Sequence, residues 1–206
     1  MIRVIDQSNS AMFAPTLDQV FKLRHACFVK ERGWQEFEKD GIYEQDQYDD
    51  DHAIYLASLD DQHDVIGCLR LYPTALPHML SEQFAYLVDG PVPSSEQVIE
   101  MTRLAIKPGR RGGETYHELL IGVQEFCIAR DILNVTAVVR ALRMSLVQKM
   151  GYQLNPLGSV HQIDGDATIA VMFDTSEPAL NKIRARTGVT HSVMEDTRVP
   201  MIRKSA

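Results

Sequence analysis

Arginines interrupt apolar runs at several places in this sequence. Arg24 lies between Phe21 and Phe28 on the apolar stripe of a helix expected over residues 16–30, and Arg70 interrupts an apolar, β-prone run. A buried guanidinium is costly unless a carboxylate or an anionic ligand pairs with it. Taken by itself, Arg24 is more simply explained as an arginine that buries its aliphatic stem and forms an ordinary salt bridge. Several such breaks together predict a buried polar site.

A carboxylate and a further arginine interrupt the strand expected over residues 97–106. Glu100 and Arg103 are three residues apart, so they point to opposite faces of a regular strand. A β-bulge between them would bring both to one site, and bulges are common beside active sites. The pair therefore predicts a bulged strand at the buried polar site.

The strongest charge cluster consists of Glu44, Asp46 and residues 49–51. An EF-hand is a poor fit because the expected glycine and the closing glutamate are missing. Most acidic runs are solvated faces, but these carboxylates could instead hold an ammonium group or a set of arginines. Trp34, the one tryptophan, lies in a polar segment. It is either part of a lid folded onto the core or an aromatic surface for a cation such as a sulfonium.

Composition and motif searches exclude several classes of protein. With 206 residues, 45% hydrophobic and 24% charged, the chain is typical of a soluble globular protein with a single domain over 1–206. Phosphate-loop, dinucleotide, nucleophile-elbow and zinc-protease motifs are absent, and the histidines and cysteines lack metal-ligand spacing, so no metal is expected. The net charge of −7 disfavours nucleic-acid binding, and no stretch is apolar enough to span a membrane. Three widely spaced cysteines and no apolar leader favour the cytoplasm.

The apolar periodicity predicts the elements that must position these residues. The expected elements are a helix over 16–30, a loop or lid over 31–52, a hairpin of 53–59 and 65–72, short helices within 75–88, a strand over 97–106, a helix over 115–132, a strand over 134–139, a helix over 141–150 and a strand over 169–173. That order predicts a mixed central sheet flanked by helices, an α/β or α+β sandwich.

Four motifs in order resemble the LuxI-type acyl-homoserine-lactone synthases. They are Arg24-x3-Phe28-x5-Trp34, Glu44-x-Asp46-x-Tyr48-Asp49, Arg70-Leu-Tyr-Pro-Thr74 and Glu100-Met-Thr-Arg103. The match spans residues 24–103; beyond residue 104 it rests on the order of elements. The resemblance implies a GNAT-like fold and synthesis of a quorum-sensing signal in two steps. The amine of S-adenosylmethionine attacks an acyl thioester of acyl carrier protein or coenzyme A, and its carboxylate then closes the lactone and expels methylthioadenosine. S-adenosylmethionine is then a substrate, and no cofactor is expected.

The resemblance also implies roles for the candidate residues. The α-ammonium must lose a proton before it attacks, so Glu100 is the candidate general base. Asp46 and Asp49 would hold the ammonium, or fix Arg70 and Arg103 toward the substrate carboxylate. The residues expected to bind S-adenosylmethionine are Arg24, Phe28, Trp34, Thr102 and Arg103, and the acyl pocket would include Phe84 and Val138.

Docking of an acidic acyl carrier protein would need a local basic patch on this acidic protein. The candidate docking residues are Lys107, Arg110, Arg111, Arg143 and Lys149. Two other functions remain open. One is a GNAT-type N-acyltransferase using acyl-coenzyme A, with the turn over 107–113 holding the pyrophosphate. The other is a catalytically silent module that binds a small molecule or an acyl carrier. Release of methylthioadenosine would distinguish all three.

Overall fold

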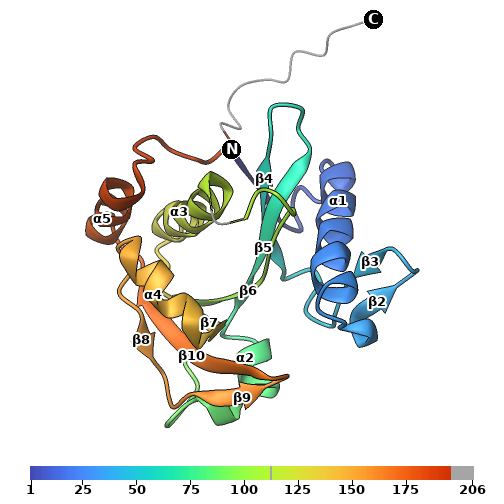
Figure 1. The fold of residues 1–206 in the computed structure, drawn as a ribbon. Helices are drawn as coiled ribbons and strands as arrows, with labels where there is room; N and C mark the ends of the chain where they lie inside the picture. Colours follow the sequence, from blue (N-terminus) through green and yellow to red (C-terminus); the bar gives the residue numbers. More distant parts are fainter. Residues whose placement is uncertain (112, 196–206) are drawn as a thin grey trace, which may run out of the picture.

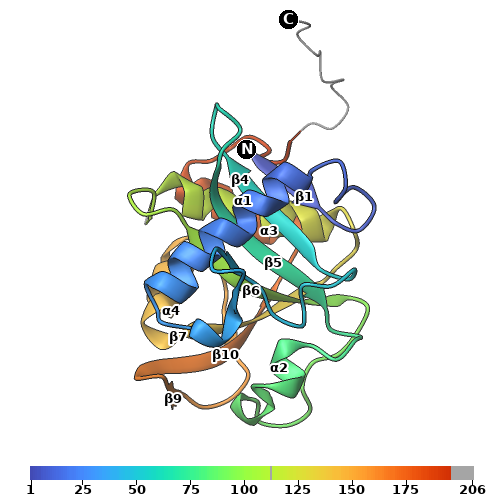
Figure 2. The ribbon, with the colours of Figure 1, turned by 90° about the vertical axis from the view of Figure 1, so that its right-hand side faces the viewer.

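A central sheet with helices on both faces forms the body of the computed structural model, which describes residues 1–111 and 113–195 (Figures 1 and 2). In spatial order its strands are β1 (Ile2–Ile5), β4 (Ile54–Leu59), β5 (Val65–Pro73), β6 (Val98–Ile106), β7 (Asn134–Arg140), β10 (Asp166–Asp174) and β8 (Asn155–Pro156), with β9 (His161–Ile163) also paired to β10. Neighbouring strands are antiparallel except β6 and β7, which run parallel.

The helices divide between the two faces of this sheet. On one face lie α1 (Ala14–Arg24), which continues into a π-helical turn (His25–Lys30), the small β2–β3 hairpin (Glu38–Lys39 and Tyr43–Glu44), and α2 (Met79–Glu82) with a 3₁₀ turn (Ala85–Leu87). On the other face lie α3 (Glu114–Ile128), α4 (Ala141–Lys149) and α5 (Glu177–Thr187). Strand alternation places Ile99 and Val135 in the core under α3, so their neighbours Glu100 and Thr136 point to the α1–α2 face.

The two parallel strands at the centre separate part-way along their length. β6 pairs with β7 from Val98 opposite Asn134 as far as Met101 opposite Ala137. Beyond that pair β6 continues to Ile106 and β7 to Arg140. We call this point of separation the fork. Among the described residues, the two strands have no further register pairs with each other beyond the fork.

The predicted mixed sheet flanked by helices is confirmed, as are the first helix, the hairpin, and the central and late strands. The predicted 31–52 loop contains the small β2–β3 hairpin. The predicted end of the helix over 115–132 was wrong. α3 stops at Ile128, and the chain reverses through Asp131, whose φ is 56°. Aspartate tolerates this left-handed conformation better than most residues.

The sequence interpretation missed β1 and α5, as well as the short strands β8 and β9. β1 is four residues long, too short for a periodic signal, and it becomes a strand by pairing with β4. α5 buries Leu180 and Ile183 but is otherwise polar. Its ends carried a signal that could have found it, since Ser176 caps the first turn and Gly188 is left-handed at the last.

Candidate active site

Three arginines and three carboxylates form a closed network on the α1–α2 face of the sheet. Arg24 contacts Glu44 (2.5 Å) and Asp49 (2.6 Å), Arg70 contacts Asp49 (2.9 Å) and Asp46 (2.5 Å), and Arg103 contacts Asp46 (2.6 Å) and Glu44 (2.8 Å). Each acid thus joins two arginines and each arginine joins two acids. We call these six residues the charge ring. Their side chains are at most 5% exposed, and their formal charges cancel.

Electrostatics favours the ionised form of Asp49 in this ring. Burial alone would raise the pKa of Asp49, but the guanidinium groups of Arg24 and Arg70 outweigh it and hold that pKa well below its usual range. Tyr55 donates a further hydrogen bond to Asp49 (2.8 Å). The acidic segment supports itself, since the amide of Asp46 donates to Asp49 and the amide of Tyr48 donates to Asp46. Local turns therefore present both carboxylates to the arginines.

The predicted bulge is confirmed, and it lies at Arg103 itself. Thr102 pairs with Arg70 whereas Ala105 pairs with Cys68, so β6 has one residue more than β5 between these pairs. Arg103 has a φ of 54°, a conformation that is uncommon for residues other than glycine. The extra residue brings Arg103 into the ring beside Arg70, and Thr102 accepts a hydrogen bond from Nε of Arg70 (3.1 Å).

Glu100 lies outside the ring, under the start of α2. Its carboxylate accepts hydrogen bonds from the backbone amides of Met79 (3.0 Å) and Leu80 (2.7 Å), and the residue is 1% exposed. Burial raises the pKa of Glu100 to about 7, although these two amides act to lower it. A carboxyl group that titrates near neutral pH is suited to accept and return a proton.

Aromatic side chains border the ring where α1 ends. Phe28 and Trp34 stack with ring centroids 5.2 Å apart and planes 10° apart. The guanidinium carbon of Arg103 lies 5.8 Å from the centroid of Phe28, 5.4 Å from that of Trp34 and 4.9 Å from that of Phe37. Trp34 is half-buried, so this cluster is both packed against the core and open at one edge. Its electron-rich surface already lies next to a cation.

Comparison with known proteins decides the family. The model of the family described as autoinducer synthase matches residues 8–183. The chain belongs to this family.

Relatives of the synthase agree with this assignment. The isovaleryl-homoserine lactone synthase of Bradyrhizobium diazoefficiens is 33% identical over 198 residues, which cover 95% of this chain and 90% of the relative. Solved structures of two coenzyme A-dependent acyl-homoserine lactone synthases each match with a TM-score of 0.87. BjaI, solved with SAM and isopentyl-CoA, is 32% identical over 95% of this chain and 92% of its own, and MesI is 26% identical over 95% and 100%.

These matches confirm the predicted family and the predicted activity, acyl-homoserine-lactone synthesis from S-adenosylmethionine and an acyl thioester. The GNAT-like fold is confirmed as well. An N-acetyltransferase structure from Lactobacillus plantarum matches with a TM-score of 0.58 at 18% identity, covering 85% of this chain and 99% of that one. That distant match concerns the fold alone.

The remaining predicted site residues of the synthase lie away from the ring. Phe84 and Val138 pack against an apolar cluster of Leu80, Leu87 and Ala170 beside the fork. The candidate docking residues Lys107, Arg110, Arg111, Arg143 and Lys149 are all exposed. Of these, Arg111 donates to Glu31 (2.6 Å) and to the carbonyl of Ile106 (3.1 Å). Gly112, within the predicted 107–113 turn, is outside the described residues.

Glu44 is the site residue that the sequence interpretation left without a role, although it was noted as part of the acidic cluster. It is fully buried and joins Arg24 to Arg103. Among the described residues no group of three or more histidine, cysteine, aspartate or glutamate side chains is placed to hold a metal ion. In the same ranges no helix has the length and apolar character needed to span a membrane.

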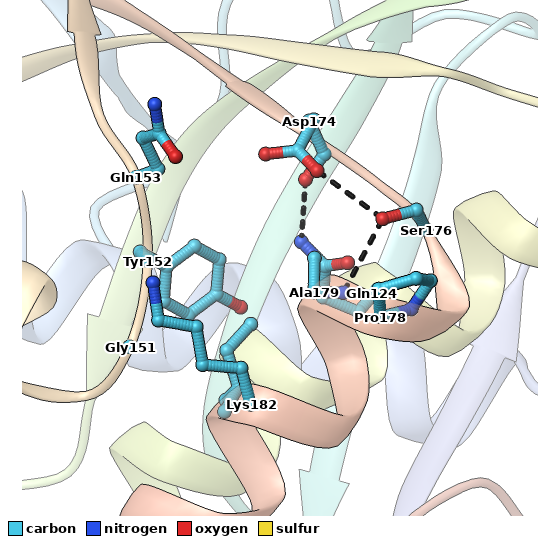
Figure 3. A pocket seen from close by; sticks show the side chains of 10 residues that line it. Gln124, Gly151, Tyr152, Gln153, Asp174, Ser176, Pro178, Ala179 and Lys182 are labelled. Atoms are coloured by element: carbon cyan, nitrogen blue, oxygen red, sulfur yellow. Dashed lines mark hydrogen bonds between the residues drawn. The ribbon is translucent and has the colours of Figure 1, made fainter.

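A separate pocket of about 190 Å³ lies on the α3–α5 side of the sheet (Figure 3). Gln124, Tyr152, Asp174, Ser176 and Lys182 are among its lining residues. None of the predicted site residues lines it, and the sheet separates it from Glu100. The charge ring and Glu100 therefore lie on the opposite face of the sheet from this pocket.

Proposed function

We propose that this synthase uses acyl-coenzyme A as its donor and S-adenosylmethionine as its acceptor, with Glu100 as the general base. The single observation that carries the mechanism is the buried Glu100 carboxyl, whose pKa of about 7 suits removal of a proton from the α-ammonium group. The freed amine attacks the thioester carbonyl. The carboxylate of the same substrate then closes on its γ-carbon and expels methylthioadenosine.

The charge ring serves to hold the acceptor in this proposal. Arg24 is fully engaged, because Nε, Nη1 and Nη2 all donate to Glu44 or Asp49. Its role is to fix those acids. Nη1 of Arg103 contacts the thioether sulfur of Met79 at 3.7 Å, a weak acceptor that a substrate carboxylate can replace. Asp46 and Asp49 accordingly orient Arg103 and Arg70, and Thr102 supports Arg70.

Phe28 and Trp34 supply the surface for the sulfonium. Both rings already lie within 6 Å of the Arg103 guanidinium, which supports their suitability for a positive group. These two aromatic side chains lie beside the charge ring. The substrate can therefore place its carboxylate on Arg103 and its sulfonium against the aromatic cluster.

The fork is the proposed path for the acyl donor. The facing edges of β6 and β7 beyond Met101 and Ala137 carry backbone groups that an extended, amide-bearing thioester arm can pair with. Phe84 and Val138, with the apolar cluster beside the fork, would enclose the acyl chain. The isovaleryl relative and the structure of BjaI with isopentyl-CoA support a short, branched acyl chain and a coenzyme A donor. The exposed basic residues 107, 110, 111, 143 and 149 would receive the polar part of the donor.

The test is to measure methylthioadenosine and acyl-homoserine lactone with S-adenosylmethionine and matched acyl donors. Isovaleryl, butanoyl and octanoyl groups would each be presented on coenzyme A and on acyl carrier protein. We expect the highest kcat/KM with short branched acyl-coenzyme A. Preference for the carrier protein would overturn the donor assignment. Acylation of simple amines without methylthioadenosine release would indicate a general N-acyltransferase instead.

A further inference from the structure

A buried threonine hydroxyl beside Glu100 has no partner among the described residues. Thr136 is 0% exposed, and its Oγ1 makes no hydrogen bond there. A hydroxyl left buried and unpaired costs roughly 1–3 kcal/mol. Two other buried threonines avoid that cost: the hydroxyl of Thr74 lies 2.8 Å from the carbonyl of Val98, to which it can donate, and Thr175 donates to the carbonyl of Ile132.

The sheet register places this hydroxyl next to the proposed base. Thr136 on β7 is directly opposite Glu100 on β6, and residues that are paired in register point to the same face. Adjacent strands lie roughly 4.8 Å apart. Thr136 is also one residue before the last β6–β7 pair, so it stands at the mouth of the fork. Amine, thioester carbonyl and base must meet at this place if the proposed function is correct.

The chemistry at this place requires a hydrogen-bond donor. When the amine nitrogen forms the C–N bond, the carbonyl electron pair moves onto oxygen. When the C=O bond re-forms, the C–S bond breaks, and the thiolate takes the proton that Glu100 removed from the ammonium group. Glu100 then accepts the second proton, which the nitrogen releases as it becomes an amide. The transient oxyanion needs a donor already in position. The proton that Glu100 takes is needed by the leaving sulfur, and Arg70 is paired with Asp46 and Asp49, so neither is free for that task.

We propose that Thr136 is a catalytic residue whose hydroxyl donates to the carbonyl oxygen of the acyl thioester and to the oxyanion formed from it. This proposal rests on the proposed function. Glu100 and Thr136 are both closed off from solvent, and α2 covers Glu100 through the amides of Met79 and Leu80.

The stability of a hydroxyl-deleted variant separates this role from a structural one. Thr136→Val keeps the shape of the side chain and removes a hydroxyl that has no partner, so its Tm should equal or exceed that of the wild type. Its kcat for methylthioadenosine release should fall about 10²-fold, the scale for loss of one oxyanion donor, with KM for both substrates within twofold. Thr136→Ser should retain kcat within about threefold.

Thr175→Val is the matched control, because it removes a buried hydroxyl that is paired and lies just after the end of β10. It should lower Tm and leave kcat unchanged. A Thr136→Val protein with wild-type kcat, or one with a lowered Tm, would overturn the proposal. Wild-type protein that is inactive with every acyl thioester would overturn the proposed function instead, and the Tm comparison would still report whether the hydroxyl is unpaired.

Discussion

Asp46 bridges two arginines: its Oδ1 and Oδ2 accept hydrogen bonds from Nη1 (2.5 Å) and Nη2 (3.0 Å) of Arg70, and Oδ2 also lies 2.6 Å from Nη2 of Arg103. Because the two arginines come from adjacent strands, β5 and β6, this acid ties the loop before β4 to the centre of the sheet. The contact makes the geometry of the site and the stability of the fold depend on one side chain.

Asp46→Asn should therefore lose both stability and activity. Removing one member of a buried ion-pair network costs roughly 3–5 kcal/mol, since it leaves the partner charge buried. In a chain of this size we expect Tm to fall by about 10 °C. Thermal unfolding followed by circular dichroism measures this. The matched control is Asp18→Asn, which breaks the exposed Asp18–Lys22 pair and should change Tm little. Equal shifts for the two variants would contradict the network.

Glu100→Gln should keep the fold and reduce kcat about 10²-fold or more, the usual scale for losing a general base. The amide retains one oxygen, which can accept from the amide of Met79 or of Leu80 but not from both, and it cannot take a proton from the ammonium group. Steady-state release of methylthioadenosine at neutral pH is the measurement. A variant with wild-type turnover would remove Glu100 from the mechanism.

The pH dependence should follow the same carboxyl group. Since its pKa in the folded protein is raised to about 7, kcat/KM should rise with pH and level off above that value. The sign for stability is opposite. The folded protein holds a proton on Glu100 between the ordinary glutamate pKa of 4.5 and about 7, so this group's contribution to stability is lost as pH rises through that range. Denaturant unfolding should show that the free energy of unfolding decreases less between pH 5 and pH 8 for Glu100→Gln than for the wild type.

Trp34 provides an optical report on the acceptor site, because it is the one tryptophan in the chain. If the sulfonium binds against the Phe28–Trp34 stack, S-adenosylmethionine should change the tryptophan emission in a saturable way. Phe28→Leu should weaken that binding several-fold by removing one of the two rings. Methylthioadenosine lacks the positive charge, so Phe28→Leu should weaken its binding less than it weakens the binding of S-adenosylmethionine. If the tryptophan emission does not change when S-adenosylmethionine is added, the ligand binds elsewhere.

Charge reversal at Arg110 and Arg143 tests the docking residues. Both side chains are exposed, and charges at the rim of an interface act mainly on association rate and salt dependence. The double variant Arg110→Glu with Arg143→Glu should raise KM for a carrier-protein donor several-fold, flatten its salt response and leave kcat nearly intact. KM for an acyl-coenzyme A donor should rise as well, because the proposed function places the polar part of that donor on these basic residues. If KM stays the same for both donors across salt concentrations, these arginines are ordinary surface residues.

The residues that break the apolar pattern were visible in the sequence by itself. Arg24, Arg70 and Glu100 interrupt periodic runs, and the cost of an unpaired buried charge makes a polar site the natural interpretation. The spacing of Glu100 and Arg103 further required a bulge, since strand alternation would otherwise separate them, and the bulge is present. Hydrophobic periodicity also predicted the mixed sheet, because the long central elements bury one clear face.

Tertiary structure alone decided which acid meets which arginine. The order around the charge ring depends on side chains from the 44–49 segment, α1, β5 and β6 converging, and no local pattern encodes that convergence. β1 likewise exists because β4 supplies its hydrogen-bonding partner. Thr136 reads in the sequence as an ordinary strand residue. Its unpaired hydroxyl beside Glu100 follows from the register of two strands joined across α3, a long-range property that residue types do not specify.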